Sequence, residues 1–153
     1  EDGPPPGTQV AGNSAAGAWV RAEAGAVLSG EKARRQSAEG LTQIVFQQSA
    51  EGLWIDSGDT LFAQVYLDPS DPPETVMLQY HDGSWDHRAY WGADKIAYGE
   101  GDSPGHRRIG PLPEAGRWVR LQVSAERLGL QAGARVSGIE NPKTPEDISS
   151  IYY

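Results

Sequence analysis

The chain of 153 residues contains no cysteine, so it forms no disulfide bonds and holds no thiolate-bound metal. Basic residues are also scarce, since 13 Lys and Arg stand against 21 Asp and Glu, for a net charge of −8. This excess of negative charge argues against binding to the phosphate backbone of nucleic acids. No apolar run is long enough to cross a bilayer, and we therefore expect no insertion into a membrane.

The sequence also lacks any long segment with the periodicity of an amphipathic helix. The chain instead has 19 Gly and 11 Pro, which divide it into short segments of alternating apolar and polar side chains. Short strands joined by turns predict an all-β fold, an antiparallel β-sandwich of jelly-roll type. We expect residues 1–17 to form an extended N-terminal segment. Residues 18–153 would then form a single β-sandwich domain, with an atypical C-terminal segment at 140–153.

The clearest strands are Thr60–Leu67 and Trp118–Val123, whose side chains alternate strictly. In both, the aliphatic residues are expected to face the core. The outward positions would then carry Phe62, Gln64, Tyr66, Trp118, Arg120 and Gln122. Leu41–Gln48 predicts a further strand, Ser29–Glu39 fits either a short exposed strand or a loop, and Gly99–Gly110 predicts a charged loop. In the segment Ser124–Leu130 we expect at most a single helical turn, which Ser124 would cap and Gly129 would end.

Asp82-Gly83 lies between two strand-like segments and favours a two-residue type I′ hairpin turn. This turn would pair Tyr80 with Trp85 and Gln79 with Asp86, and it separates two faces. One face, expected to be core, carries Val76, Leu78, Tyr80, Trp85, His87, Ala89 and Trp91. The other carries Met77, Gln79, His81, Ser84, Asp86, Arg88 and Tyr90. The second face combines hydrogen-bonding groups with a flat ring, which suits a polar, ring-shaped ligand.

The candidate ligand-binding residues come from this polar face and from the preceding strand. They are Gln64, Tyr66, Gln79, Asp86, Arg88 and Tyr90. A carboxylate and a guanidinium can hydrogen-bond adjacent sugar hydroxyls, but Asp86 and Arg88 fit an exposed charge pair as well. Tyr90 fits a stacking role and a structural role equally. Gln64 and Tyr66 would widen the same face only if their strand neighbours the hairpin.

Two long phrases, GDTLFAQVYLDPSDPPETVMLQYHDGSWDHRAYWG and GPLPEAGRWVRLQVSAERLGL, carry a family resemblance. Between Ser29 and Ile139 the chain resembles a concanavalin A-like or LamG-like β-sandwich module, similar to the domain appended to planctomycete cytochrome-type proteins and to some RHS-repeat proteins. The resemblance implies a non-catalytic, lectin-like module of a larger bacterial protein. It further implies a monomer that binds polysaccharide or glycan in the periplasm, on the cell surface or outside the cell.

The C-terminus departs from that family. After Ile139 the family continues with an aromatic strand and a Trp-Asp pair, whereas this chain reads ENPKTPEDISSIYY. Either Ile148–Tyr153 supplies a substitute strand, or the last strand of the sandwich is missing.

Motifs for catalysis and metal binding are not evident. The chain has no G-x-S-x-G elbow, P-loop or dinucleotide fingerprint, and its carboxylates show no pairing of the kind that glycoside hydrolysis needs. The three histidines lack metal-site spacing. Four loop carboxylates could hold a structural calcium ion, although aspartate before Gly or Pro also favours turns. They are Asp56, Asp59, Asp68 and Asp71.

We therefore expect no catalytic residue, no metal site and no cofactor. The leading hypothesis is a carbohydrate-binding module that uses a polar and aromatic sheet face. The alternative is a structural or adhesion module that contacts a protein partner or a neighbouring domain.

Overall fold

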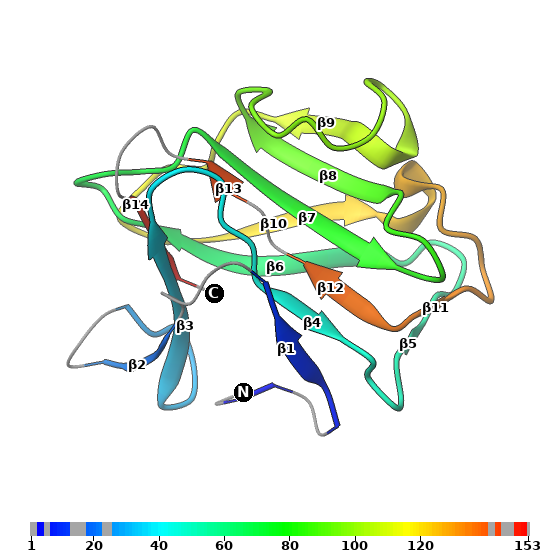
Figure 1. The fold of residues 1–153 in the computed structure, drawn as a ribbon, viewed down its shortest axis with the longest axis horizontal. Coiled ribbons are helices and arrows are strands. Elements are labelled where there is room, and N and C mark those ends of the chain that lie inside the picture. The colour runs from blue at the N-terminus through cyan, green and yellow to red at the C-terminus, as the bar shows by residue number, and fades with distance from the viewer. Residues whose placement is uncertain are drawn as a thin grey trace.

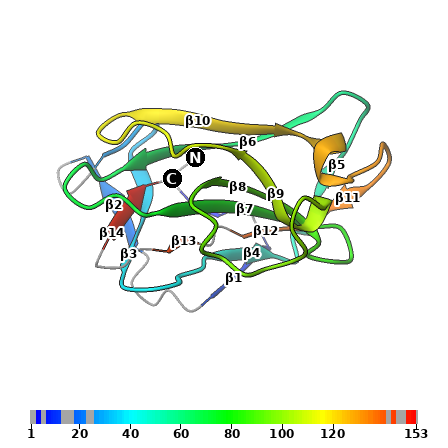
Figure 2. The same cartoon turned by 90° about the horizontal axis from the view of Figure 1, so that it is seen from above.

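The protein is described by a computed structural model, which covers residues 3–4, 7–12, 18–22, 26–140, 143–144 and 149–152. Two main sheets stack face to face, which confirms the predicted β-sandwich of jelly-roll type (Figure 1). Seen from above, β6 and β10 lie in one layer, and β7, β8 and β12 lie in the other (Figure 2). None of the helical segments in these ranges is long and apolar enough to span a membrane.

The strands of the larger sheet follow one another in space as β1 (Gln9–Ala11), β4 (Val45–Gln47), β12 (Gly138–Glu140), β7 (Thr75–His81), β8 (His87–Gly92) and β9 (Arg107–Gly110). β13 (Lys143–Thr144) also pairs with β7. The second sheet has the order β10 (Trp118–Ser124), β6 (Thr60–Leu67), β14 (Ser149–Tyr152), β3 (Lys32–Ala38) and β2 (Ala18–Arg21). A small third pair joins β11 (Arg135–Val136) to β5 (Leu53–Trp54). All described pairings are antiparallel except β8 with β9, which is parallel.

The core between the two layers follows the predicted alternation. Val65, Leu78 and Leu121 are at most 3% exposed, as expected for inward residues of β6, β7 and β10. Trp118 has the opposite parity and is partly exposed, which was also expected. The predicted helical turn is present, since the 3₁₀ turn η2 (Ala125–Leu128) ends at Gly129 in the left-handed conformation, but Ser124 makes no side-chain capping hydrogen bond.

The hairpin register differs from the prediction by two residues. Tyr80 pairs with His87 rather than with Trp85, and five residues connect the strands instead of two. Asp82 does not adopt positive φ, because the described non-glycine residues with positive φ are Gln48 and Asp102. Its carboxylate instead accepts a hydrogen bond from the Ser84 N–H and lies 2.9 Å from Nε2 of His87, which braces a wider loop.

A shift of two residues leaves the two hairpin faces intact but removes Trp85 from the strand. Trp85 is not a core residue, since its ring lies 5.0 Å from that of His81 on the opposite face. Trp91 stays in the core and is 6% exposed, as predicted.

Several predicted boundaries also need correction. The extended segment at 1–17 contributes a strand, β1, which is hydrogen-bonded to β4. Only Val45–Gln47 of the expected strand at 41–48 is regular, and the expected loop at 99–110 contains the 3₁₀ turn η1 (Pro104–His106) and β9.

Two open alternatives are resolved. The segment at 29–39 forms a strand, β3, rather than a loop. β14 pairs with both β3 and β6, so the C-terminal segment supplies a strand inside the second sheet. Ile148 and Tyr153, the ends of the predicted strand, lie outside the described residues.

Candidate functional site

The polar face of the hairpin, where the sequence places four candidate residues, is covered. Gln79 is 1% exposed and Tyr90 is 5% exposed. Tyr90 packs with Met77 and Ile96 in a second, smaller core, and Ile96 comes from the segment at 93–106 that follows β8. Of the four, only Asp86 remains open, with 73% of its side chain exposed. The expectation of an accessible binding face at this position is therefore wrong.

Arg88, whose side chain is largely buried, lies at the centre of a hydrogen-bond network that reaches the surface only at Asp86. Its Nε donates to Oε1 of Gln79, and its Nη1 donates to Oδ1 of Asp86 at 3.1 Å and to the Gly105 carbonyl at 3.0 Å. The guanidinium carbon also lies 5.8 Å from the centre of the Tyr98 ring. Its contacts with the protein thus give Arg88 a structural role.

Glu140 belongs to the same buried region and is 8% exposed. Burial raises the pKa of its carboxyl, and the positive charge of Arg88 offsets part of that rise. Glu140 is thus a buried carboxyl group close enough to interact with Arg88, and it keeps its proton to a higher pH than an ordinary glutamate.

Tyr90 is held by the segment at 93–106. Its ring lies 4.7 Å from that of His106, whose Nδ1 is 2.6 Å from the Tyr98 carbonyl and whose Nε2 is 2.8 Å from Oδ1 of Asp94. Burial, followed by the nearby charge of Asp94, raises the pKa of the Tyr90 hydroxyl. These contacts fix the position of Tyr90 and leave it no room to stack on a ligand.

Gln64 and Tyr66 do not join the hairpin face. Their strand, β6, pairs with β10 and β14 in the second sheet, whereas the hairpin belongs to the larger sheet. The predicted adjacency is therefore wrong. Chain order placed β6 next to β7, but the connection between them crosses from one layer of the sandwich to the other.

In the described part of the chain, the outer surface of β6 and β10 is an open face that combines polar and aromatic side chains. Cross-strand pairs on it join Trp118 with Tyr66, Arg120 with Gln64, and Gln122 with Phe62. Phe62 is 52% exposed, and Arg120 and Gln122 are exposed as well. We call these six residues the β6/β10 face, and in Figure 2 none of the described strands stacks on its outer side.

The rings of the β6/β10 face form two groups. Tyr66 and Trp118 are 6.0 Å apart and tilted by 57°, so together they form an angled surface rather than a flat one. The guanidinium of Arg120 lies 3.8 Å from the centre of the Phe62 ring, within the range of a cation–π contact. Apolar ring faces and hydrogen-bonding groups are thus interleaved on an exposed surface, an arrangement suited to polar, ring-shaped molecules.

Sequence reasoning placed all six side chains outward but selected only Gln64 and Tyr66 as ligand candidates. The outward parity of Trp118, Arg120 and Gln122 was the available signal. The sequence pattern did not indicate whether loops cover the hairpin face or the β6/β10 face.

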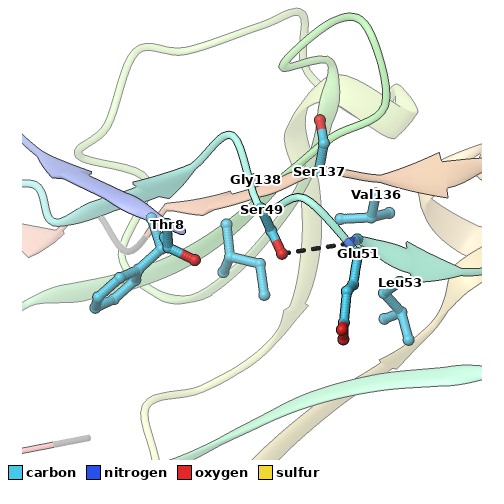
Figure 3. A pocket seen from close by; sticks show the side chains of 10 residues that line it. Thr8, Ser49, Glu51, Leu53, Val136, Ser137 and Gly138 are labelled. Atoms are coloured by element: carbon cyan, nitrogen blue, oxygen red, sulfur yellow. Dashed lines mark hydrogen bonds between the residues drawn. The ribbon is translucent and has the colours of Figure 1, made fainter. Parts of the chain in front are cut away.

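A pocket of about 270 Å³ opens elsewhere, where β1, β4, β5 and β12 approach one another (Figure 3). Its walls are mostly apolar and include Phe46, Leu53 and Ile139. Polar groups line it as well: Ser49 Oγ accepts a hydrogen bond from the Gly52 N–H at 3.3 Å, and Oγ1 of Thr8 is buried without a partner among the described residues.

The pocket exists because the inner face of the larger sheet extends beyond its cover. One cross-strand row runs from Tyr80 through Ile139 and Phe46 to Val10. Along it, exposure rises from 2% at Tyr80 to 37% at Ile139 and 49% at Val10. The uncovered end is an aliphatic surface with a single aromatic ring.

The loop carboxylates that were weighed as calcium ligands serve turns. Asp68 Oδ1 accepts hydrogen bonds from both the N–H and the hydroxyl of Ser70, and Asp59 Oδ2 accepts from the Asp56 N–H. The described part of the chain contains no group of three or more His, Cys, Asp or Glu that could hold a metal ion.

Comparison with known proteins supports the fold. No family model matches the chain, and no curated protein does, so the resemblance to LamG-like domains stays a prediction. Among solved structures, the carbohydrate-binding module TmCBM61, solved in complex with β-1,4-galactotriose, is similar with a TM-score of 0.56. The match covers 98% of this chain and 86% of that one, at 12% sequence identity. A likeness at this identity confirms the β-sandwich fold.

Proposed function

We propose that this domain is a non-catalytic carbohydrate-binding module that binds a glycan chain on the β6/β10 face. The observation that carries the proposal is the combination, on one sheet surface, of exposed Phe62 and Arg120 with half-buried Gln64, Tyr66 and Trp118. Sugar rings present C–H faces that pack on aromatic rings and hydroxyls that need paired donors and acceptors. The fold shared with TmCBM61 adds support.

The face is a better candidate than the pocket of Figure 3. The pocket wall is mostly aliphatic and has one aromatic ring, whereas the β6/β10 face has three rings beside an amide and a guanidinium. The face also lies on two regular strands, which hold its side chains at fixed spacing. By analogy with the exported modules that the sequence resembles, we further propose that the domain acts outside the cytoplasm as part of a larger protein.

The test compares two tryptophans. Trp118→Ala removes a ring from the proposed site. Trp54→Ala removes a 62% exposed ring from β5, which pairs with β11 and belongs to neither main sheet. We expect Trp118→Ala to weaken glycan binding by about 1–3 kcal/mol, the scale of a buried aromatic contact, and Trp54→Ala to leave it unchanged.

Calorimetry against a panel of oligosaccharides that includes β-1,4-galactotriose gives the affinities, and a thermal melt confirms that each variant is folded. Equal affinities for the parent and the Trp118 variant would place the site elsewhere. A parent domain that binds nothing across the panel would refute the proposed function.

A second candidate function is a structural or adhesion role. It is favoured by the uncovered apolar surface around the pocket of Figure 3, where Leu53 is 47% exposed and Val10 is 49% exposed. Crosslinking of the parent protein through a cysteine placed at position 53 would detect a neighbouring domain or protein on this surface. If this role is right, the cysteine at position 53 gives a specific crosslink, and a control cysteine at position 127, in η2, does not. The absence of a crosslink specific to position 53 would contradict the role.

A further inference from the structure

Arg120 is held in place on the β6/β10 face before any ligand arrives. Its guanidinium lies 3.8 Å from the centre of the Phe62 ring, and its strand position pairs it with Gln64. A guanidinium that packs on an aromatic ring keeps N–H donors at its edge, in the fork geometry that matches a carboxylate. Less side-chain freedom is therefore lost when an anion binds.

No acidic residue of the described chain neutralises this guanidinium. Arg120 has no hydrogen-bond or ion-pair partner among the described residues, whereas Arg117, three positions earlier, pairs with Glu114 at 2.8 Å. The outward positions of the two strands contain no carboxylate at all. They are Thr60, Phe62, Gln64, Tyr66, Trp118, Arg120, Gln122 and Ser124. In a chain with a net charge of −8, this face is locally positive.

The cation is also within reach of the aromatic pair. Trp118 and Arg120 are two residues apart on β10, which separates them by about 6.8 Å along the strand. A sugar ring stacked on Trp118 and Tyr66 can therefore direct a substituent toward Arg120. Gln64, opposite Arg120, offers an amide to a neighbouring hydroxyl.

We propose that the β6/β10 face selects acidic glycans, and that Arg120 binds the carboxylate of a uronic acid residue stacked beside it. This inference rests on the proposed function and adds the class of sugar. The carboxylate would accept two N–H donors from the guanidinium, and the ring would contact Trp118 or Tyr66.

The test uses two ligands that share the same sugar rings and differ at their carboxyl groups, trigalacturonate and its uncharged methyl ester, with β-1,4-galactotriose as a neutral reference. Calorimetry on the whole domain should give about tenfold tighter binding of the acid than of the ester, and added salt should weaken only the acid. Arg120→Gln should abolish the preference, because it removes the charge that binds the carboxylate and so weakens the acid more than the ester. Arg127→Gln, which removes the same charge from exposed η2, should keep the preference.

Equal affinity of the parent domain for acid and ester would overturn the inference, as would an Arg120→Gln variant that weakens both ligands alike. Binding of galactotriose without binding of trigalacturonate would also refute acid selection while leaving the proposed function in place. If none of the three ligands, nor any other glycan, binds to the folded domain, both the inference and the proposed function fail.

Discussion

Replacement of Arg88 by alanine should destabilise the domain strongly, because Arg88 holds the loop at 93–106 against the larger sheet. The side chain is 11% exposed and donates to Gln79, Asp86 and the Gly105 carbonyl. Hydrogen bonds that involve a charged group each contribute about 1.5–3 kcal/mol. The contacts of one guanidinium are not independent, so we expect their combined loss to cost about 3–5 kcal/mol rather than the full sum.

For a domain of this size, a loss of about 3–5 kcal/mol corresponds to a fall in Tm of about 6–20 °C. Thermal melts and urea titrations of the parent and of Arg88→Ala measure this loss. The matched control is Asp86→Ala, because the Asp86 side chain is 73% exposed and its pair with Arg88 should contribute at most about 1 kcal/mol. A loss below about 1 kcal/mol for Arg88→Ala, or an equal loss for both variants, would refute the assignment of a structural role to Arg88.

Two further predictions concern the core and the buried carboxyl. Leu121→Ala should lower the free energy of unfolding by about 2–5 kcal/mol through lost burial and a new cavity, since Leu121 is 3% exposed. Urea titration measures this loss, and a value well below about 1 kcal/mol would mean that the inward face of β10 is misassigned. Burial raises the pKa of Glu140 in the folded state, so the folded protein binds the proton more tightly than the unfolded chain, and this group's contribution to stability falls as pH rises above 4.5, its ordinary value. Glu140→Gln should therefore gain stability relative to the parent as pH rises from 4.5 through the raised pKa, and a pH-independent difference between the two proteins would contradict the shift.

Much of the fold could be predicted because side-chain alternation is a local property. The inward and outward residues of β6 and β10 follow directly from their period of two. The 3₁₀ turn at Ala125–Leu128 was predicted from Gly129, which ends it. The hairpin register could not be predicted, because the Asp-Gly signal assumes a backbone turn. In this protein the Asp82 side chain instead bonds Ser84 and contacts His87, which supports a longer connection.

The location of the candidate site depended on contacts between segments far apart in the sequence. The polar residues of β7 and β8 resemble a binding surface in the pattern alone, and nothing local indicates that the segment at 93–106 folds back over Tyr90. Likewise, β14 lies between β6 and β3, an arrangement that chain order does not suggest. The sequence therefore predicted a sheet face that combines polar and aromatic side chains. Tertiary contacts determine that the β6/β10 face stays open and that the hairpin face is covered.

The difference between the two surfaces also bears on affinity. A ligand on the hairpin face would first have to displace the loop that carries Gly105, and so break its bond with Arg88. If that opening costs about 3 kcal/mol, only about one molecule in a hundred or fewer is competent to bind, and the apparent affinity falls by the same factor. On the β6/β10 face, Arg120 is already positioned over Phe62 and has no protein partner to give up among the described residues. Similar rings and hydrogen-bonding groups thus occur on both sheets. On the larger sheet they contact the protein itself, and on the β6/β10 face they are open to a ligand.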